Sequence, residues 1–179
     1  MKIAILAGCL LAATALAQGT VDFSNYKTAS GIDAPFFWID GVTKLSSAFL
    51  AQLYAGPVGG SLAPVGAAVP FRDVNGIGTG YVVAGKVVIP TVAEGAKANV
   101  VMKAWEAAAG GNYEAAMWSG RFYGQSMMIE ITTGGDNLEP PAIPAPLVGL
   151  MSFSLIPEPA TLPLLALGFA GLVACRRRA

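Results

Sequence analysis

Histidine is absent from the 179-residue chain, and cysteine and charged residues are scarce. Without histidine, a Ser-His-Asp triad and histidine-ligated metal sites are excluded. Two cysteines are too few for a multi-disulfide scaffold. The eleven basic and eleven acidic residues balance, which excludes a strongly basic nucleic-acid binder, and 54% hydrophobic residues exclude a disordered acidic chain. The length indicates one domain.

The N-terminus has the pattern of a secretory signal peptide over residues 1–17. Lys2 supplies a positive n-region, an apolar stretch follows, and Ala15 and Ala17 form the small-x-small pattern that a signal peptidase cleaves. We therefore expect the mature chain to begin at Gln18 and to be exported.

A second apolar run lies at the C-terminus, over residues 162–175, and is followed by Arg176, Arg177 and Arg178. As a helix, these 14 residues would reach about 21 Å, which is short for a bilayer core of about 30 Å. We expect one short transmembrane helix here. Because clustered positive charge stays on the cytoplasmic side, residues 18–160 are predicted to lie outside the inner membrane.

Pro157, Glu158 and Pro159 precede this run. Together with the apolar run and the arginine tail, they resemble the PEP-CTERM sorting signal of diderm bacteria over residues 156–179. The resemblance implies an exosortase partner, a membrane-embedded transpeptidase that carries the catalytic cysteine, and makes the three motif residues recognition residues of a substrate. Pro163, early in the apolar run, departs from the pattern. Upstream, a weaker resemblance extends to the uncharacterised ectodomains of such proteins.

Removing both ends changes the chemistry of the part that is delivered. Loss of Lys2 and the three arginines leaves seven basic residues, and loss of Glu158 leaves ten acidic ones, for a net charge near −3. Both cysteines, Cys9 and Cys175, leave as well. The exported region of nearly 140 residues must therefore rely on a packed core.

Residues 18–133 are predicted to form an all-β ectodomain, a two-sheet sandwich of immunoglobulin or fibronectin type. Glycine or proline interrupts this region every 8–12 residues, and it has no long amphipathic helical pattern. A short helical turn is expected only at residues 112–118. The predicted strands are 21–25, 48–54, 81–83, 86–89, 99–106 and 127–132, with a hairpin turn at Ala84-Gly85.

The alternation of apolar and polar residues assigns the faces of two of these strands. Phe49, Ala51 and Leu53 should share one face, and Met127, Ile129 and Ile131 should point inward. The predicted core residues are Trp105, Phe49, Leu53 and Ile129.

Residues 134–155 are predicted to be a proline-rich linker with a possible last strand. Four prolines within residues 140–146 favour an extended spacer, and residues 134–146 could span up to roughly 40 Å. Residues 151–155 alternate again and form either an edge strand of the sandwich, which we favour, or a stalk.

Chemistry-bearing motifs are weak, and we expect no catalytic, cofactor-binding or metal-binding residues. The glycine-rich residues 76–81 lack the third glycine of a dinucleotide-binding loop and favour a hairpin loop. Asp73 and Asn75 begin like a calcium loop but lack its later ligands, which leaves an irregular site as an alternative. No pair of carboxylates stands out, and Glu106 and Glu130 are expected to face solvent.

Aromatic residues allow one binding hypothesis. A sugar-stacking platform could be formed by Phe36, Phe37, Trp38, Trp105, Trp118, Phe122 and Tyr123, the alternative being core and ordinary loops. The leading expectation is a non-enzymatic protein of the cell surface or extracellular matrix, with an exopolysaccharide matrix as a further candidate partner. The alternatives are a carbohydrate-binding or carbohydrate-acting module, and a permanently anchored protein that is not processed.

Overall fold

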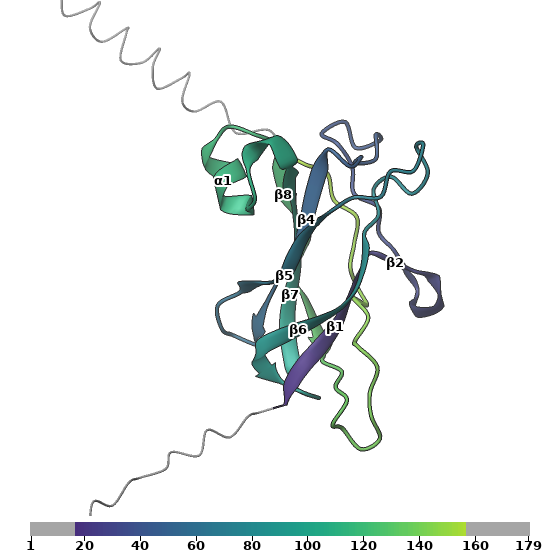
Figure 1. Cartoon of the computed structure of the whole chain (residues 1–179), viewed down its shortest axis with the longest axis vertical. Coiled ribbons are helices and arrows are strands. Elements are labelled where there is room, and N and C mark those ends of the chain that lie inside the picture. The colour runs from purple at the N-terminus through teal and green to yellow at the C-terminus, as the bar shows by residue number, and fades with distance from the viewer. Residues whose placement is uncertain (1–16, 157–179) are drawn as a thin grey trace, which may run out of the picture.

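The computed structural model describes residues 17–156, which form mainly β-strands (Figure 1). One short helix, α1 (Tyr113–Trp118), lies where a helical turn was predicted, and the 3-10 turns η1 (Thr28–Ser30) and η2 (Ala107–Ala109) complete the helical content of this region. The all-β fold class is thereby confirmed. The strands are β1 (Gln18–Ser24), β2 (Tyr26–Lys27), β3 (Ile32–Asp33), β4 (Phe49–Pro57), β5 (Ala63–Pro70), β6 (Val83–Ala93), β7 (Lys97–Glu106), β8 (Tyr123–Gln125) and β9 (Ile129–Thr132).

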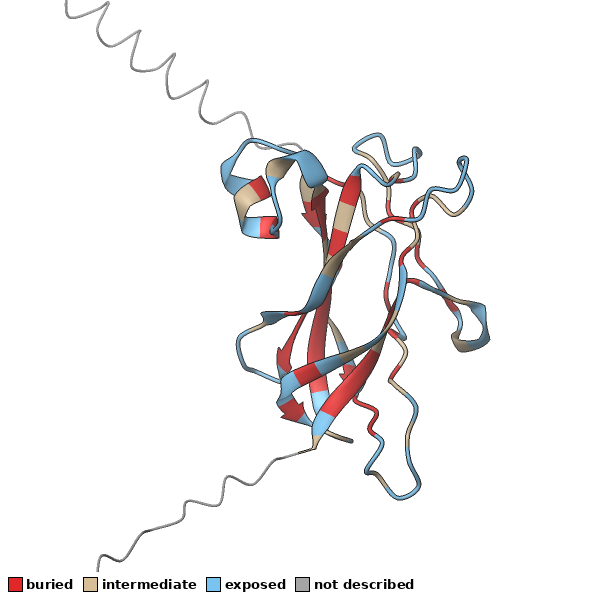
Figure 2. Cartoon of the chain, viewed as in Figure 1, coloured by how far each residue is buried: buried red, intermediate tan, exposed pale blue. Residues whose placement is uncertain are grey.

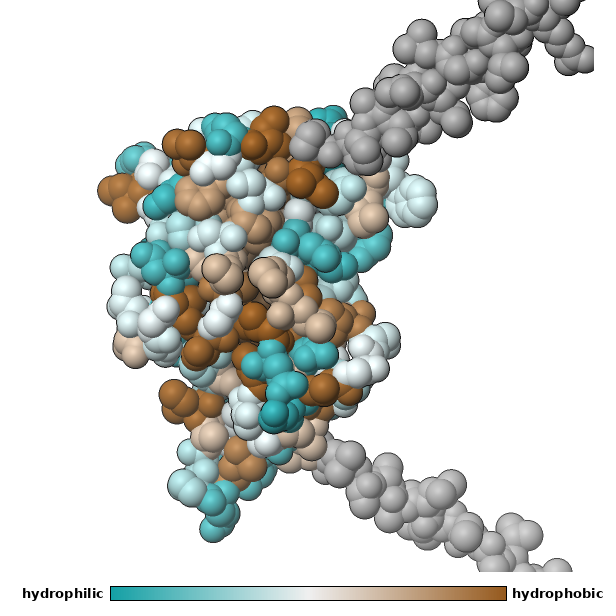
Figure 3. Space-filling view, turned by 180° about the vertical axis from the view of Figure 1, so that it is seen from behind, coloured by the Kyte–Doolittle hydropathy of each residue, from teal (hydrophilic) through white to brown (hydrophobic). Residues whose placement is uncertain are grey.

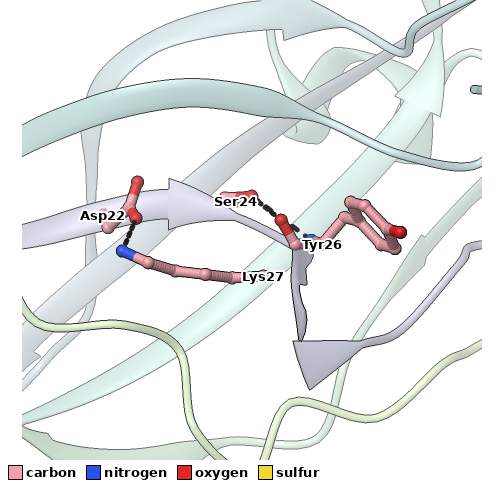
Figure 4. A network of polar contacts seen from close by, with 4 residues as sticks. All are labelled: Asp22, Ser24, Tyr26 and Lys27. Atoms are coloured by element: carbon pink, nitrogen blue, oxygen red, sulfur yellow. Dashed lines mark hydrogen bonds and ion pairs between the residues drawn. The ribbon is translucent and has the colours of Figure 1, made fainter. Parts of the chain in front are cut away.

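The strands form two layers that face each other. One layer is a five-stranded sheet in the order β5-β4-β7-β8, in which β9 also pairs with β7, and the other is the β1–β6 ribbon (Figure 1). All pairs between these strands are antiparallel. The small β2–β3 hairpin follows β1, and at this corner Ser24 Oγ donates to the Tyr26 carbonyl at 2.8 Å while Lys27 pairs with Asp22 (Figure 4).

The alternation of side chains along β4 explains the two sides of the central sheet. Phe49, Ala51 and Leu53 are buried against the β1–β6 ribbon, where Val21 and Phe23 face them in the main core (Figure 2). The predicted inward face of this strand is confirmed. The other side of the sheet holds a second cluster under α1, formed by Tyr54, Trp105, Tyr113 and Ala116. Trp105 is fully buried, as predicted, but belongs to this second cluster.

Two strand predictions near the sheet edges are wrong. The hairpin at Ala84-Gly85 does not form, because β6 runs through both residues and pairs with β1 on either side of them. Gly85, at φ 85°, opens a bulge in this ladder instead of a turn. The strand expected at residues 127–132 begins only at Ile129, and Met127 is 72% exposed. Ile131 is buried, whereas Ile129 is only partly buried.

The proline-rich segment is not an extended spacer, because it folds back along the domain. Gly134 exchanges backbone hydrogen bonds with Thr20, and Ala145 pairs with the same edge of β1. Leu147, Leu150 and Leu155 are buried in the main core. The leucines that follow the prolines gain from this burial free energy that an extended chain in water would not provide. Residues 151–155 do not form a regular strand, and they pair through one isolated bridge, between Ser154 and Phe37.

Three connections gather at one end of the domain, which we call the motif-proximal end. They are residues 25–48 between β1 and β4, 71–82 between β5 and β6, and 107–122 between β7 and β8, and the described chain also ends there, at Ile156 (Figure 1). The start of β1 lies at the opposite, motif-distal end (Figure 1).

The terminal predictions fall outside the described residues. This applies to Ala15 within the signal peptide, to the motif residues Pro157, Glu158 and Pro159, to the transmembrane run 162–175, and to the arginine tail. Within residues 17–156, no helix has the length and apolarity needed to cross a membrane.

Candidate functional site

The last described residues, 153–156, are held on the motif-proximal end by backbone hydrogen bonds, and we call them the strap. Phe37 donates its N–H to the carbonyl oxygen of Phe153 at 3.0 Å and accepts from the N–H of Leu155 at 3.0 Å. Ile156 then donates to the carbonyl oxygen of Tyr123 at 2.9 Å. The strap therefore lies between the first long connection of the chain and β8.

Side chains reinforce this docking. Leu155 is buried in the main core, and the Phe153 ring lies 4.0 Å from that of Phe36, measured between centroids. Gly124 lies beneath the strap, and an added Cβ there would come within 2.9 Å of Phe153 Cε2 and 3.2 Å of Leu155 Cα. Only glycine lets the strap approach β8 this closely.

A hollow of about 510 Å³ opens beside the strap. It lies between α1, β7, β8 and the strap, and it is lined by Lys103, Tyr113, Met117, Tyr123, Gly124, Gln125, Ser154 and Ile156. The end of the described chain and α1 thus line the same hollow.

A lysine held among aromatic rings forms the floor of this region. Lys103 Nζ lies 3.8 Å from the centroid of the Tyr54 ring, 4.4 Å from that of Tyr113 and 3.6 Å from Glu114 Oε1. The Tyr54 hydroxyl donates to Glu114 at 2.9 Å. These contacts satisfy the ammonium group by cation–π attraction and an ion pair.

The ionisation of this cluster favours structure over catalysis. Burial, followed by the hydrogen bond and charge of Glu114, raises the pKa of Tyr54, and burial, followed by the charges of Tyr123 and Glu114, raises the pKa of Tyr113 to about 12. Burial by itself raises the pKa of Glu114. Hydrogen bonds and the charge of Lys103 together lower this pKa by more, so the net shift is downward. At neutral pH the tyrosines stay protonated and Glu114 stays ionised, which suits a fixed ion pair rather than proton transfer.

The aromatic residues of the sugar-platform hypothesis are divided by the fold. Phe36 and Trp105 are fully buried in different clusters, and Trp118 is 86% exposed at the end of α1. Trp38 is half-buried and packs against Phe122, with ring centroids 4.2 Å apart and the ring planes tilted by 57°. The seven residues therefore do not form one platform.

The glycine-rich loop and the calcium-like motif form one tight turn. Val74 and Ile77 bond to each other through their backbones, and Asp73 Oδ1 accepts from the N–H of Gly76 at 3.0 Å. The Asp73 side chain thus stabilises the turn itself. Over the part of the chain that the structure describes, no cluster of three or more cysteine, aspartate or glutamate residues could hold a metal ion.

Comparison with protein families identifies the segment that begins within the strap. Residues 155–178 match the family described as the PEP-CTERM protein-sorting motif. The chain carries a PEP-CTERM sorting signal. The match includes Leu155 and Ile156, so the PEP-CTERM signal begins on residues that are folded onto the domain. Searches among curated proteins and among solved structures found no match.

The docking partners of the PEP-CTERM signal were not identified from the sequence. The sequence indicates Phe37 and Tyr123 only as sugar-stacking candidates, and no pattern in it points to Gly124. The alternation at residues 151–155 was the one available signal, because it correctly indicated that this segment returns to the domain. It could not identify the partners, which are far from it in the chain.

Proposed function

We propose that this protein is an exported, non-enzymatic component of the cell envelope or extracellular matrix, delivered as an exosortase substrate. The observation that carries the proposal is the PEP-CTERM sorting motif at residues 155–178, which joins a folded β domain without an intervening spacer. In this proposal, Pro157, Glu158 and Pro159 are the residues that the exosortase recognises.

The two ends of the sequence support this route. Signal peptidase would cleave after Ala17, and the apolar run 162–175 would hold the precursor in the inner membrane as a single-pass protein. Arg176, Arg177 and Arg178 would keep the tail cytoplasmic and the β domain outside. The exosortase would then act near the PEP motif and release the domain for display on the surface or in an exopolysaccharide matrix.

The mass of the envelope protein tests the sorting proposal. We expect the mature wild-type protein to lack the three terminal arginines, and Glu158→Ala to retain them in an unprocessed membrane form. Glu139→Ala is the matched control, because Glu139 is also a glutamate that precedes a proline and is exposed within the folded domain. Wild-type protein that retains Arg176 to Arg178, or normal processing of Glu158→Ala, would overturn the proposal and favour a permanently anchored protein.

A carbohydrate-binding role for the same delivered domain is the second candidate. Its support is a hollow of about 330 Å³ that combines aromatic and polar side chains, lined by Trp38, Thr43, Lys44, Leu45, Ser46 and Phe49. An aromatic face beside hydroxyl groups suits a sugar ring. If the wild type binds envelope polysaccharide and Trp38→Ala does not, this role is favoured. Equal binding by the wild type and Trp38→Ala would show that Trp38 does not contribute to a sugar site.

The immunoglobulin- or fibronectin-type topology remains part of the proposal for the β domain. Its support is the packing of the β1–β6 ribbon against the five-stranded sheet across a single core. Such sandwiches commonly act as display or binding modules, which fits a non-enzymatic role.

A further inference from the structure

Apolar side chains are exposed at all three connections of the motif-proximal end. Val42 is 78% exposed in the first connection, Ile77 75% exposed in the second, and Trp118 86% exposed in the third. Other exposed apolar residues of this end are Ile39, Val74, Met117 and Ile156. Hydrophobic surface gathers beside the point where the described chain ends (Figure 3). Single exposed apolar side chains are common on protein surfaces, so the position of these residues beside the end of the described chain, rather than their number, is what bears on a contact.

The loops that carry these side chains have few free backbone donors at their tips. Asp40 accepts from the N–H groups of Val42 and Thr43 and from the Thr43 hydroxyl. In the second loop, Val74 and Ile77 exchange backbone hydrogen bonds, and Asp73 Oδ1 accepts from the N–H of Gly76. Backbone groups that are already bonded can enter a less polar medium at much lower cost than free ones. Both tips therefore suit a lipid interface.

The covalent connection determines which surface lies near these loops. Five residues, 157–161, separate Ile156 from the apolar run that begins at Leu162. Even a fully extended chain allows only about 20 Å between Ile156 and the start of that run. While the run is in the bilayer, Ile156, at the motif-proximal end, must stay within about 20 Å of the membrane.

We infer that the motif-proximal end is a membrane-contacting surface, in which Val42, Ile77 and Trp118 enter the lipid headgroup region of the anchored precursor. The inference rests on the proposed membrane-anchored precursor and adds a second contact to it. Trp118 is suited to this position because an indole ring buries its apolar body and keeps its N–H among polar headgroups. The charges beside the two loop tips balance, with Asp40 near Lys44 and Asp73 next to Arg72, so the contact should depend on apolar burial and little on salt.

The motif-distal end provides a matched comparison. Val58 lies in the turn between β4 and β5, and Ile143 lies in the segment that returns along β1, and both are exposed. The ten residues of β7 place the two ends about 30 Å apart. A residue at the motif-distal end should therefore remain in water when the motif-proximal end touches lipid.

The test uses the anchored precursor, residues 18–179, reconstituted into vesicles of phosphatidylethanolamine and phosphatidylglycerol. Cys175→Ser removes its one cysteine, and an environment-sensitive dye is attached to a new cysteine in Val42→Cys, Ile77→Cys, Val58→Cys or Ile143→Cys. Bromine-labelled lipids then quench any dye that lies in the interface. We expect loss of emission for Val42→Cys and Ile77→Cys, at low and high salt, and none for Val58→Cys and Ile143→Cys.

The outcomes separate this inference from the proposed function. Vesicle flotation shows whether the chain is anchored, and a chain that does not float overturns both the anchor and the lipid contact. A chain that floats while the dyes at the two ends respond alike overturns the lipid contact only. A change in the emission of the dye at Val42→Cys that appears only after an exosortase is added would also overturn the lipid contact, in favour of a contact with the enzyme.

Discussion

Ile156 donates its backbone N–H to the carbonyl oxygen of Tyr123 at 2.9 Å, and the next residue in the chain is Pro157. The folded domain is therefore fastened directly against the sorting motif. A transpeptidase that binds an extended stretch on both sides of its cut site would need the strap to be released first. Under the proposed function, the stability of the strap would therefore affect how easily the sorting signal is processed.

Gly124→Ala should loosen the strap. The new methyl group would meet Phe153 and the backbone of Leu155 at 2.9 and 3.2 Å, so we expect a loss of about 1–3 kcal/mol in docking. Hydrogen exchange should then be faster at the Leu155 and Ile156 amides. Gly111→Ala is the control, because its Cβ would meet nothing within 4 Å. Equal exchange in both variants would show that Gly124 does not limit the docking.

Truncation of the buried tryptophan should lower the unfolding free energy far more than truncation of the exposed one. Trp105 is fully buried, and its Nε1–H donates to the Gly110 carbonyl at 3.0 Å. Trp105→Ala should therefore lower the unfolding free energy by about 3–5 kcal/mol. Trp118→Ala should change it by no more than about 0.5 kcal/mol, because the side chain is exposed. Denaturant unfolding measures both, and similar losses would contradict the two assigned environments.

Asn25 is expected to be the most sensitive polar residue of the motif-proximal end. Its fully buried side chain donates to the carbonyls of Ala34 and Gly80 and accepts from the N–H of Val82. Asn25→Ala leaves the Ala34 carbonyl and the Val82 N–H without partners, whereas the Gly80 carbonyl still accepts from the N–H of Phe36. We expect a loss of about 3 kcal/mol in unfolding free energy. Asn112→Ala, which removes only the cap of α1, should cost about 1 kcal/mol. A smaller loss for Asn25→Ala than for the cap would contradict the network.

The ion pair of Glu114 should make a small, pH-dependent contribution to stability. The folded state lowers the pKa of Glu114 from its usual 4.5, so its contribution is present above that pH and is lost as the pH falls through the folded pKa. Because the side chain is about half exposed, we expect less than about 1 kcal/mol.

The difference in unfolding free energy between the wild type and Glu114→Gln should therefore be present at pH 7 and shrink as the pH falls below 4.5 toward the lowered pKa of folded Glu114. In a Tyr54→Phe background, which lacks the phenol that donates to Glu114, the difference at pH 7 should shrink. A difference that is constant with pH would assign the effect of Glu114→Gln to packing alone.

Local patterns in the sequence predicted several parts of the fold correctly. The alternation of Phe49, Ala51 and Leu53 identified the inward face of β4, and the helical turn near Tyr113 was found at its expected place. The turn prediction at Ala84-Gly85 failed because a glycine with positive φ can open a bulge as well as a hairpin. Only the pairing of β6 with β1 distinguishes the two.

The sequence by itself determined the all-β character and the sorting signal, because both depend on the order and type of neighbouring residues. Glycine and proline spacing, strand alternation, and a Pro-Glu-Pro motif before an apolar run and arginines are all local features. Tertiary structure alone decided that residues 134–150 pack on the domain and that Tyr123 and Phe37 hold the strap. These contacts join residues distant in the chain, and their formation depends on how much apolar surface the folded core can still bury.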